Sequence, residues 1–182
     1  MANKLDIINS ALVSLGAPPV QDLDSSTASK AAAAFWPMVV PATLRSHPWN
    51  FSVTRRTLAP LATSPDHGYS QAFPLPSDWI RTLSTSEDDF KSEGKKILCN
   101  AASLQLRYVA MVEDPAQWDA LFCEAVAVHI AAKLAYPLTK SASQADVCWS
   151  AYKEILRLAR SVDSLEEPPD EFEESSLITS RG

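Results

Sequence analysis

Residues 113–162 decide the fold, and they read EDPAQWDALFCEAVAVHIAAKLAYPLTKSASQADVCWSAYKEILRLARSV. Asp114-Pro115-Ala116-Gln117 is typical of a helix start, because aspartate caps free N–H groups, proline suits the first helical position and glutamine completes a capping box. Apolar residues then recur three and four apart until Tyr136-Pro137, where we expect the helix to end. Ser143-Gln144-Ala145-Asp146 predicts the cap of a second such helix. The short connection makes the two helices antiparallel neighbours.

The first 48 residues predict two more helices, which can cover the apolar stripes of that pair. Residues 3–15 place apolar side chains on one face, and a Gly-Ala-Pro-Pro sequence after them marks a helix end. Residues 24–27 offer several caps for an alanine-rich second helix that stops before His47-Pro48. Pro37 and Pro41 lie inside this second pattern, and we expect a kink or a break there because each proline removes a backbone donor.

Between the helix pairs, the sequence changes to the alternating apolar and polar pattern of β-strands. The expected strands are residues 50–58, 79–84 and 104–112. Residues 60–76, rich in proline and serine, read as a loop, and Ser92-Glu93-Gly94-Lys95 reads as a hairpin turn. These strands predict one small antiparallel sheet inserted between the helices.

The last part of the chain differs in charge. Residues 163–182 contain seven acids and one base, a net charge of −6, whereas residues 1–162 carry fifteen charges of each sign. Such a segment buries too little apolar surface to fold alone. We expect an extended acidic C-terminal arm, held on another chain by apolar anchors between the acids. These candidate partner-binding residues are Leu165, Phe172, Leu177 and Ile178.

The predicted fold class is therefore α+β and mainly α. Residues 1–48 and 113–162 form an antiparallel helical bundle, residues 49–112 the inserted antiparallel sheet, and residues 163–182 the extended C-terminal arm. A chain of 182 residues fits one domain with an insertion. We expect no membrane-spanning segment, and we expect the three cysteines to be reduced core thiols because no pair has metal or redox spacing.

The residue types that form catalytic sites in other proteins do not form a catalytic set in this sequence. The chain has only four glycines and no phosphate-cradling loop, and its three histidines are far apart in sequence. We expect His47 to be a capping or hinge group and His129 to be a core histidine. We therefore predict a protein that is not an enzyme, with no metal and no cofactor.

Two basic pairs are the candidates for contact with phosphates. Arg55 and Arg56 lie on a predicted strand, and Lys95 and Lys96 lie beside the predicted hairpin turn. Either these residues contact phosphates, or they are ordinary strand charges that oppose edge-to-edge aggregation. The neutral body argues against a general nucleic-acid-binding protein, which should be clearly basic.

Two stretches carry a family resemblance: residues 5–20 read LDIINSALVSLGAPPV, and residues 45–51 read RSHPWNF. With the alanine-rich second helix, the β insertion and a closing helix pair joined by Tyr136-Pro137-Leu138-Thr139, they resemble head-to-tail adaptor proteins of tailed phages. This family includes the tail tubular protein A proteins of short-tailed phages. The acidic segment at 163–182 departs from the family's pattern.

The resemblance implies a structural protein of the virion, assembled in the host cytoplasm and located at the head–tail interface. Such adaptors form a homo-oligomeric ring, usually twelvefold, beneath the portal protein, and tail, stopper or nozzle proteins dock below. Double-stranded DNA passes through the ring, for which a near-neutral wall is better suited than a basic one. The candidate channel residues are then Arg55, Arg56, Lys95 and Lys96. By this resemblance we expect a weakly associating monomer that becomes a ring on the portal, without membrane contact, and we expect the C-terminal arm to lie on a neighbouring subunit or on the portal.

The alternative from another class is a small nucleic-acid-binding regulatory protein. That function needs a basic recognition surface, against which the neutral body and the acidic tail both argue. A small hydrolase, a third class, needs a convergent catalytic site, and none can be assembled from the sequence.

Overall fold

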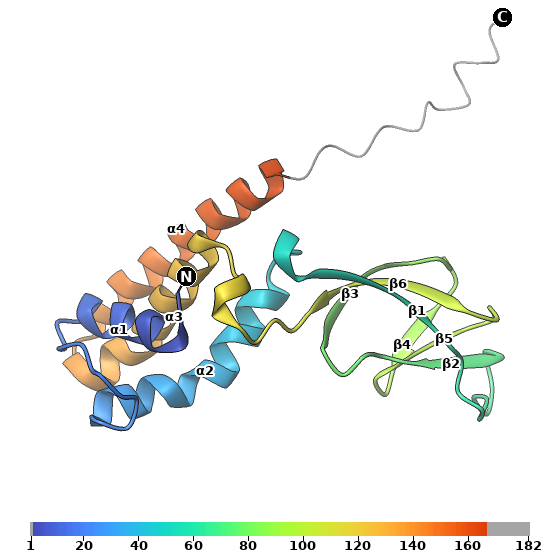
Figure 1. The fold of residues 1–182 in the computed structure, drawn as a ribbon, viewed down its shortest axis with the longest axis horizontal. Coiled ribbons are helices and arrows are strands. Elements are labelled where there is room, and N and C mark those ends of the chain that lie inside the picture. Colours follow the sequence, from blue (N-terminus) through green and yellow to red (C-terminus); the bar gives the residue numbers. More distant parts are fainter. Residues whose placement is uncertain (1, 167–182) are drawn as a thin grey trace, which may run out of the picture.

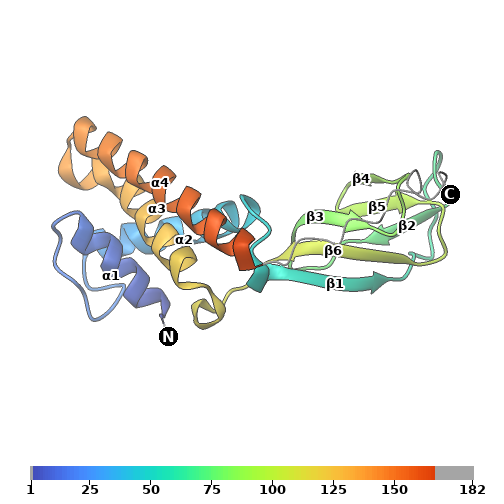
Figure 2. The ribbon, with the colours of Figure 1, turned by 90° about the horizontal axis from the view of Figure 1, so that it is seen from above.

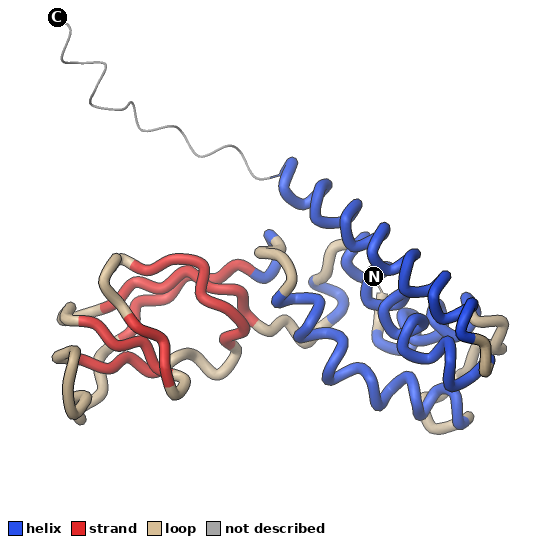
Figure 3. The backbone as a smooth tube through the Cα atoms, turned by 180° about the vertical axis from the view of Figure 1, so that it is seen from behind, coloured by secondary structure: helices blue, strands red, loops and turns tan. Residues whose placement is uncertain are grey.

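Helices gather at one end of the molecule and strands at the other in the computed structural model, which describes residues 2–166 (Figures 1 and 3). The helices are α1 (Lys4–Ser14), α2 (Thr27–Arg45), α3 (Ala120–Thr139) and α4 (Ala142–Glu166). The strands are β1 (Val53–Leu58), β2 (Gln71–Pro74), β3 (Trp79–Thr85), β4 (Lys91–Glu93), β5 (Lys96–Cys99) and β6 (Leu104–Ala110). This arrangement confirms the predicted α+β fold, mainly α, with the strands inserted between two helix pairs.

The start of α3 differs from the prediction. Asp114 opens only a short 3₁₀ turn, and α3 begins at Ala120, where the Asp119 carboxylate accepts hydrogen bonds from two backbone N–H groups. Between the two aspartates, the buried Trp118 donates its indole N–H to the carbonyl of Val112 at 2.9 Å. This tryptophan fixes a corner in the chain, so the helix starts at the second aspartate rather than the first.

The turn between α3 and α4 also corrects the predicted boundaries. Pro137 does not end α3, because near the end of a helix a proline removes only one hydrogen bond and the chain tolerates the loss. The helix ends at Thr139, and Lys140 follows in the left-handed region with φ 56°. Ser141 then accepts a hydrogen bond from the N–H of Gln144 at 3.2 Å, so α4 is capped two residues before the predicted site.

The centre of the bundle is α3, which contacts α1, α2 and α4. Within the described residues α3 alone is long and apolar enough to cross a membrane by length and composition, which the sequence interpretation did not anticipate. In this fold 56% of the apolar window is buried inside the protein, as expected for a core helix. The fully buried side chains on its inner faces include Phe122, Val126, Ile130 and Leu134.

The helix α2 continues through both of its prolines, so of the predicted kink or break, the break does not occur. Its buried residues Val39, Val40 and Leu44 belong to the core cluster that includes α3. This burial holds α2 in helical form where the missing backbone donors alone would favour a break.

The β region contains two three-stranded antiparallel sheets, ordered β1-β6-β3 and β2-β5-β4, instead of the single sheet that we predicted. The second sheet forms because β2 lies inside the stretch interpreted as a loop. Phe73 of β2 is fully buried, together with Ile97 of β5 and Leu106 and Tyr108 of β6. One apolar core therefore joins the two sheets. On the opposite face of β1-β6-β3, Val109 is buried in the core of the bundle, and polar side chains lie farther along the strands.

Candidate functional site

The outer face of the sheet β1-β6-β3 brings together polar residues from three strands. In the antiparallel register Arg55 lies opposite Arg107, and Arg107 lies opposite Ser84. Thr57 lies opposite Gln105, whose backbone N–H donates to the Ser86 hydroxyl at 3.2 Å. Residues that are directly opposite in an antiparallel pair point to the same face of the sheet. We call this set the arginine face; it comprises Arg55, Thr57, Ser84, Ser86, Gln105 and Arg107.

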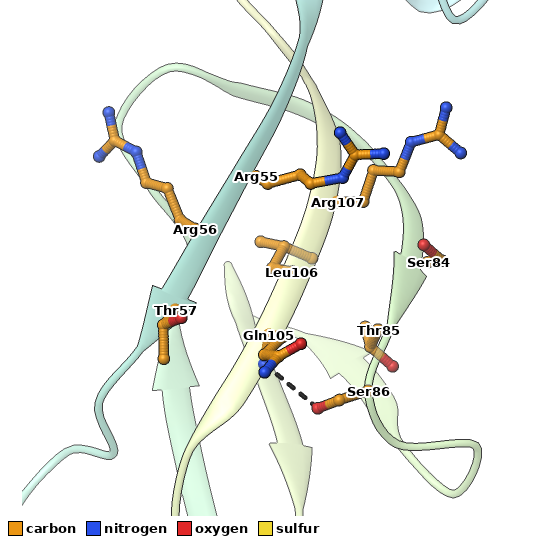
Figure 4. A pocket seen from close by; sticks show the side chains of 9 residues that line it. All are labelled: Arg55, Arg56, Thr57, Ser84, Thr85, Ser86, Gln105, Leu106 and Arg107. Carbon is orange, nitrogen blue, oxygen red and sulfur yellow. Dashed lines mark hydrogen bonds between the residues drawn. The ribbon is translucent and has the colours of Figure 1, made fainter.

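Two like charges face each other at the centre of the arginine face. Arg55 is exposed and Arg107 is half-buried; the Arg55 side chain extends over β6, and that of Arg107 extends from β6 toward β3 (Figure 4). Like charges directly opposite each other destabilise a sheet, by a few tenths of a kcal/mol to about 1 kcal/mol. Guanidinium groups donate pairs of hydrogen bonds to phosphate or carboxylate oxygens, so this part of the face has the donor chemistry that suits an anion.

A shallow pocket of about 450 Å³ lies over the arginine face. Besides the arginine-face residues, its lining includes Arg56, Thr85 and Leu106, and none of these described lining residues is a histidine, a cysteine or an acid. Guanidinium, hydroxyl and amide groups recognise the oxygens of an anion, but they supply neither a nucleophile with its base nor a metal ligand set. The pocket is therefore suited to binding an anionic chain.

The structure separates the two arginines that the sequence placed side by side. Arg56 points away from Arg55, as the alternation of a strand requires (Figure 4). The Arg56 guanidinium lies 3.5 Å from the carboxylate of Asp78, which also accepts a hydrogen bond from the Tyr108 hydroxyl at 3.1 Å. Arg56 thus has an acidic partner on its own side of the strand.

The candidate lysines lie in the other sheet. Gly94 and Lys95 form the turn of the predicted β4–β5 hairpin, with φ values of 54° and 59°. Lys96 lines a different pocket, together with Asp66 and His67. The four predicted channel residues therefore do not form one site, and only Arg55 belongs to the arginine face.

Sequence reasoning missed Arg107 as a site residue. The alternation of residues 104–112 placed Arg107 and Gln105 on the polar side of a strand, and this is where they lie. The alternation of residues does not determine which strand pairs with β6 or in what register. Without the register, Arg107 could not be matched with Arg55.

A junction of hydrogen bonds connects the end of α4 to the residues just before β1. The Asp163 carboxylate accepts a hydrogen bond from the backbone N–H of Asn50 at 3.1 Å and lies 3.1 Å from Nε2 of His47. The Asn50 side chain donates to the carbonyl of Asp163 at 2.8 Å. Figure 2 shows the end of α4 beside the start of β1. His47 therefore lies at the connection between bundle and sheet, consistent with its predicted hinge role.

This junction corrects the predicted start of the C-terminal arm. Residues 163–166 belong to α4, and Asp163 is buried with 6% exposure, so they are not part of an extended arm. Leu165 lies on this last helical turn and is 82% exposed. The other three proposed anchors, Phe172, Leu177 and Ile178, lie outside the described residues.

The stretch 45–51 makes two further hydrogen bonds, one to the strand β3 and one to the helix α2. Arg45 donates from Nη1 to the carbonyl of Ile80 at 2.6 Å, and the fully buried Trp49 donates to the carbonyl of Thr43 at 3.0 Å. Burial lowers the pKa of His47 below its usual value, although Asp163 acts in the opposite direction. The imidazole is therefore neutral near pH 7, and it contacts Asp163 by a hydrogen bond rather than as a charged pair.

A second basic surface lies on α4, next to the junction. A groove of about 580 Å³ is lined by His47, Lys153, Leu156, Arg157, Arg160, Ser161 and Ser164. Arg157 in this groove bonds to Glu154 one helical turn away, which satisfies part of its charge. The groove on α4 is thus a separate cationic surface from the arginine face.

His129 is buried in the bundle, as predicted. It is 7% exposed, stacks on Tyr152 with ring centroids 4.1 Å apart, and has Nδ1 at 3.3 Å from the Thr43 hydroxyl. Burial, with a smaller effect from Lys133, lowers the pKa of His129 to about 4. Within residues 2–166, no group of three or more His, Cys, Asp or Glu side chains could hold a metal ion.

No protein-family model matches this chain, and no curated protein matches it. The resemblance to phage adaptors therefore depends on the residues of the two motifs and on the order of the elements.

Proposed function

We propose that this protein is a structural head-to-tail adaptor of a tailed bacteriophage. In this proposal it forms a ring under the portal, usually of twelve subunits, extends the DNA channel and docks tail or stopper proteins. The observation that carries the proposal is the junction at residues 45–51. This stretch is one of the two most similar to the adaptors. In it Arg45 bonds to Ile80 of β3, while His47 and Asn50, just before β1, bond to Asp163 of α4.

The element order supports the same function. Two helices, a β insertion and a closing antiparallel helix pair follow one another in the order that the resemblance implied. The insertion extends from one end of the bundle, so the molecule has two ends of different chemistry (Figure 1). An elongated subunit with distinct ends can contact different partners above and below a ring.

The arginine face gives the proposal a candidate DNA contact. A single pair of arginines in each subunit would become a thin band of positive charge when symmetry repeats it around a ring. Each phosphate contact adds salt-dependent affinity, so a few contacts per subunit guide DNA without holding it in place. We therefore expect weak, sequence-independent interaction with double-stranded DNA.

Native mass spectrometry with and without the portal protein of the same phage tests the proposal. The protein alone should be a monomer that associates weakly, and a ring of subunits should form when the portal ring is present. A stable dimer that does not bind the portal would rule out the adaptor function.

The arginine face also favours one alternative, a small nucleic-acid-binding regulatory protein. A gel-shift experiment on duplex DNA at low salt separates the two functions. Binding that is submicromolar and selective for one sequence would support the regulator, because sequence selectivity requires contacts to base edges, which the wall of a DNA channel does not need. Weak binding that is equal for all sequences and is lost with added salt would agree with the adaptor.

A further inference from the structure

Two arginines near the junction have no acidic partner among the described residues. Arg160 lies on α4 and lines the groove there, and Arg81 lies on β3. Neither belongs to an ion pair within residues 2–166, and the buried Nε of each has no hydrogen-bond partner there. Folded proteins leave few buried polar groups unpaired, and each such group needs an explanation such as a bound ion.

Both arginines act on His47, the histidine of the junction. Burial is the main cause of the lowered pKa of His47, and the charge of Asp163 acts against it. The positive charges of Arg160 and Arg81 lower this pKa further, so both guanidinium groups lie close to the imidazole. The carboxylate of Asp163 is already engaged by the N–H of Asn50 and by the ring of His47. Two cations from two elements therefore meet one acid that is bonded elsewhere.

The groove on α4 supplies further donors around Arg160. The exposed Lys153 and the hydroxyl groups of Ser161 and Ser164 line the same groove, whereas Arg157 in it is bound to an acid one helical turn away. None of the described lining residues is an acid. Guanidinium, ammonium and hydroxyl groups all donate hydrogen bonds, and a phosphate group presents acceptor oxygens in several directions together with the opposite charge. The donor set of the groove therefore suits a phosphate group.

We propose that the groove on α4 is a phosphate-binding site, in which Arg160 is the central contact and Arg81 adds positive charge from β3. A phosphate group bound there is attracted by both elements, so its binding stabilises the contact between bundle and sheet. The phosphate is either free in solution or part of a DNA backbone. This inference concerns the protein alone, and it holds or fails independently of assembly on a portal.

Proton NMR of the His47 ring in the full-length protein tests the site directly. The probe is sodium phosphate, and sodium chloride at equal ionic strength gives the same general screening. A bound anion favours the protonated imidazole, so we expect phosphate to raise the pKa of His47 in a saturable manner. His67, an exposed residue between β1 and β2, is the internal control and should not show this change. An equal effect of chloride, or an equal response of His67, would overturn the inference.

Variants of the groove connect this response to the named residues. Arg160→Gln should weaken phosphate binding about tenfold or more, the usual effect of losing a hydrogen bond to a charged group. Lys153→Gln, on an exposed residue whose change leaves the core intact, should also weaken it, so the test does not depend on one variant that must fold. Circular dichroism verifies the fold of each.

Arg55→Gln is the matched control, because it makes the same change on the arginine face. We expect this variant to keep the response of His47 to phosphate. If Arg160→Gln and Lys153→Gln bind phosphate as well as the natural protein, or if Arg55→Gln abolishes the response, the phosphate does not bind in the groove and the inference is wrong.

A short random-sequence DNA duplex identifies the source of the phosphate. If the groove binds backbone phosphates, the duplex should raise the pKa of His47 and compete with inorganic phosphate. If the groove binds a free phosphate group, inorganic phosphate should act on His47 while the duplex does not. Both of these results support the site. No response of His47 to either probe would overturn it.

Discussion

At the scale of single residues, His129 should make stability depend on pH. Its pKa is about 4 in the folded protein, below its ordinary 6.5, so the unfolded chain binds a proton that the folded chain does not. Stability is fully present above pH 6.5 and falls as the pH drops toward 4. We expect a loss of about 2 kcal/mol from this group between pH 7 and pH 5.

Urea unfolding of the natural protein and of His129→Gln at pH 7 and pH 5 measures this effect. The variant is expected to be less stable at pH 7, because it loses the stacking on Tyr152. Its further loss on going to pH 5 should be smaller than that of the natural protein. The same pH slope in both proteins would mean that another group, such as His47, is responsible.

Asp163 is the residue whose removal should loosen the junction most. Asp163→Ala leaves the N–H of Asn50 and the ring of His47 without their acceptor in a buried place. We expect the free energy of unfolding to fall by about 2–3 kcal/mol, the usual cost of orphaned buried partners. The neighbouring change Ser164→Ala, on an exposed residue, is the control and should be within about 0.5 kcal/mol of the natural protein. Comparable losses in both variants would contradict the anchoring role of Asp163.

The sequence showed which residues were polar, but it did not show which of them meet. Arg55 and Arg56 are adjacent in the chain, yet they lie on opposite sides of β1, and the true neighbour of Arg55 is Arg107, which is 52 positions away in sequence. Asp163 was assigned to a separate arm because its neighbours are acidic. Its bonds to Asn50 and His47 depend on tertiary contact, and composition carries no information about such contacts.

At the scale of elements, the prolines of α2 give a direct prediction. Pro37 is exposed in the middle of a continuous helix, where it removes the backbone hydrogen bond to the residue four positions earlier. Pro37→Ala restores that donor, and we expect the helix to gain about 1–3 kcal/mol in stability. Thermal unfolding followed by circular dichroism measures the change.

Pro18→Ala, an exposed change outside the helices, is the control for Pro37→Ala. It should not stabilise the protein, since it only adds freedom to the unfolded chain. If Pro37→Ala is less stable than the natural protein, the proline is instead fitted to a local bend that an alanine does not support.

Element types were predictable where one physical signal dominated. Apolar spacing identified all four helices of the described residues, and alternation identified β6 and the β4–β5 hairpin. The signal failed for β2, because its four residues lie in a proline- and serine-rich stretch and are too few for a pattern. Only pairing with β5 and burial of Phe73 make this segment a strand. Helix ends were misplaced where two capping residues competed, as at Asp114 and Asp119.

At the scale of the whole molecule, the order of helices and strands could be predicted, but the connection between the two parts could not. The junction unites residues 45–51 with the end of α4, and it also sets where the C-terminal segment begins. A truncation that tests this segment must therefore follow Glu166. A cut placed before Asp163 would remove a structural residue and confuse loss of folding with loss of binding.

We expect a chain truncated after Glu166 to keep the helicity and stability of the natural protein, because the two core clusters are built from residues within 2–166 as far as the structure describes the chain. Ring formation on the portal should nevertheless weaken markedly if Phe172, Leu177 and Ile178 anchor the subunit on its neighbour or on the portal. Each fully buried apolar side chain contributes roughly 1.5–3 kcal/mol before the cost of ordering the segment. Phe172→Ala in the full chain should therefore reproduce part of the loss.

Native mass spectrometry of portal mixtures measures the assembly, and circular dichroism of the same samples verifies the fold. Leu165→Ala separates the contribution of the last helical turn from that of the segment beyond it, since Leu165 is the one proposed anchor within the described residues. A truncated protein that assembles as well as the full chain would remove the segment from the assembly contacts. The adaptor proposal would then depend on the bundle and the sheet alone.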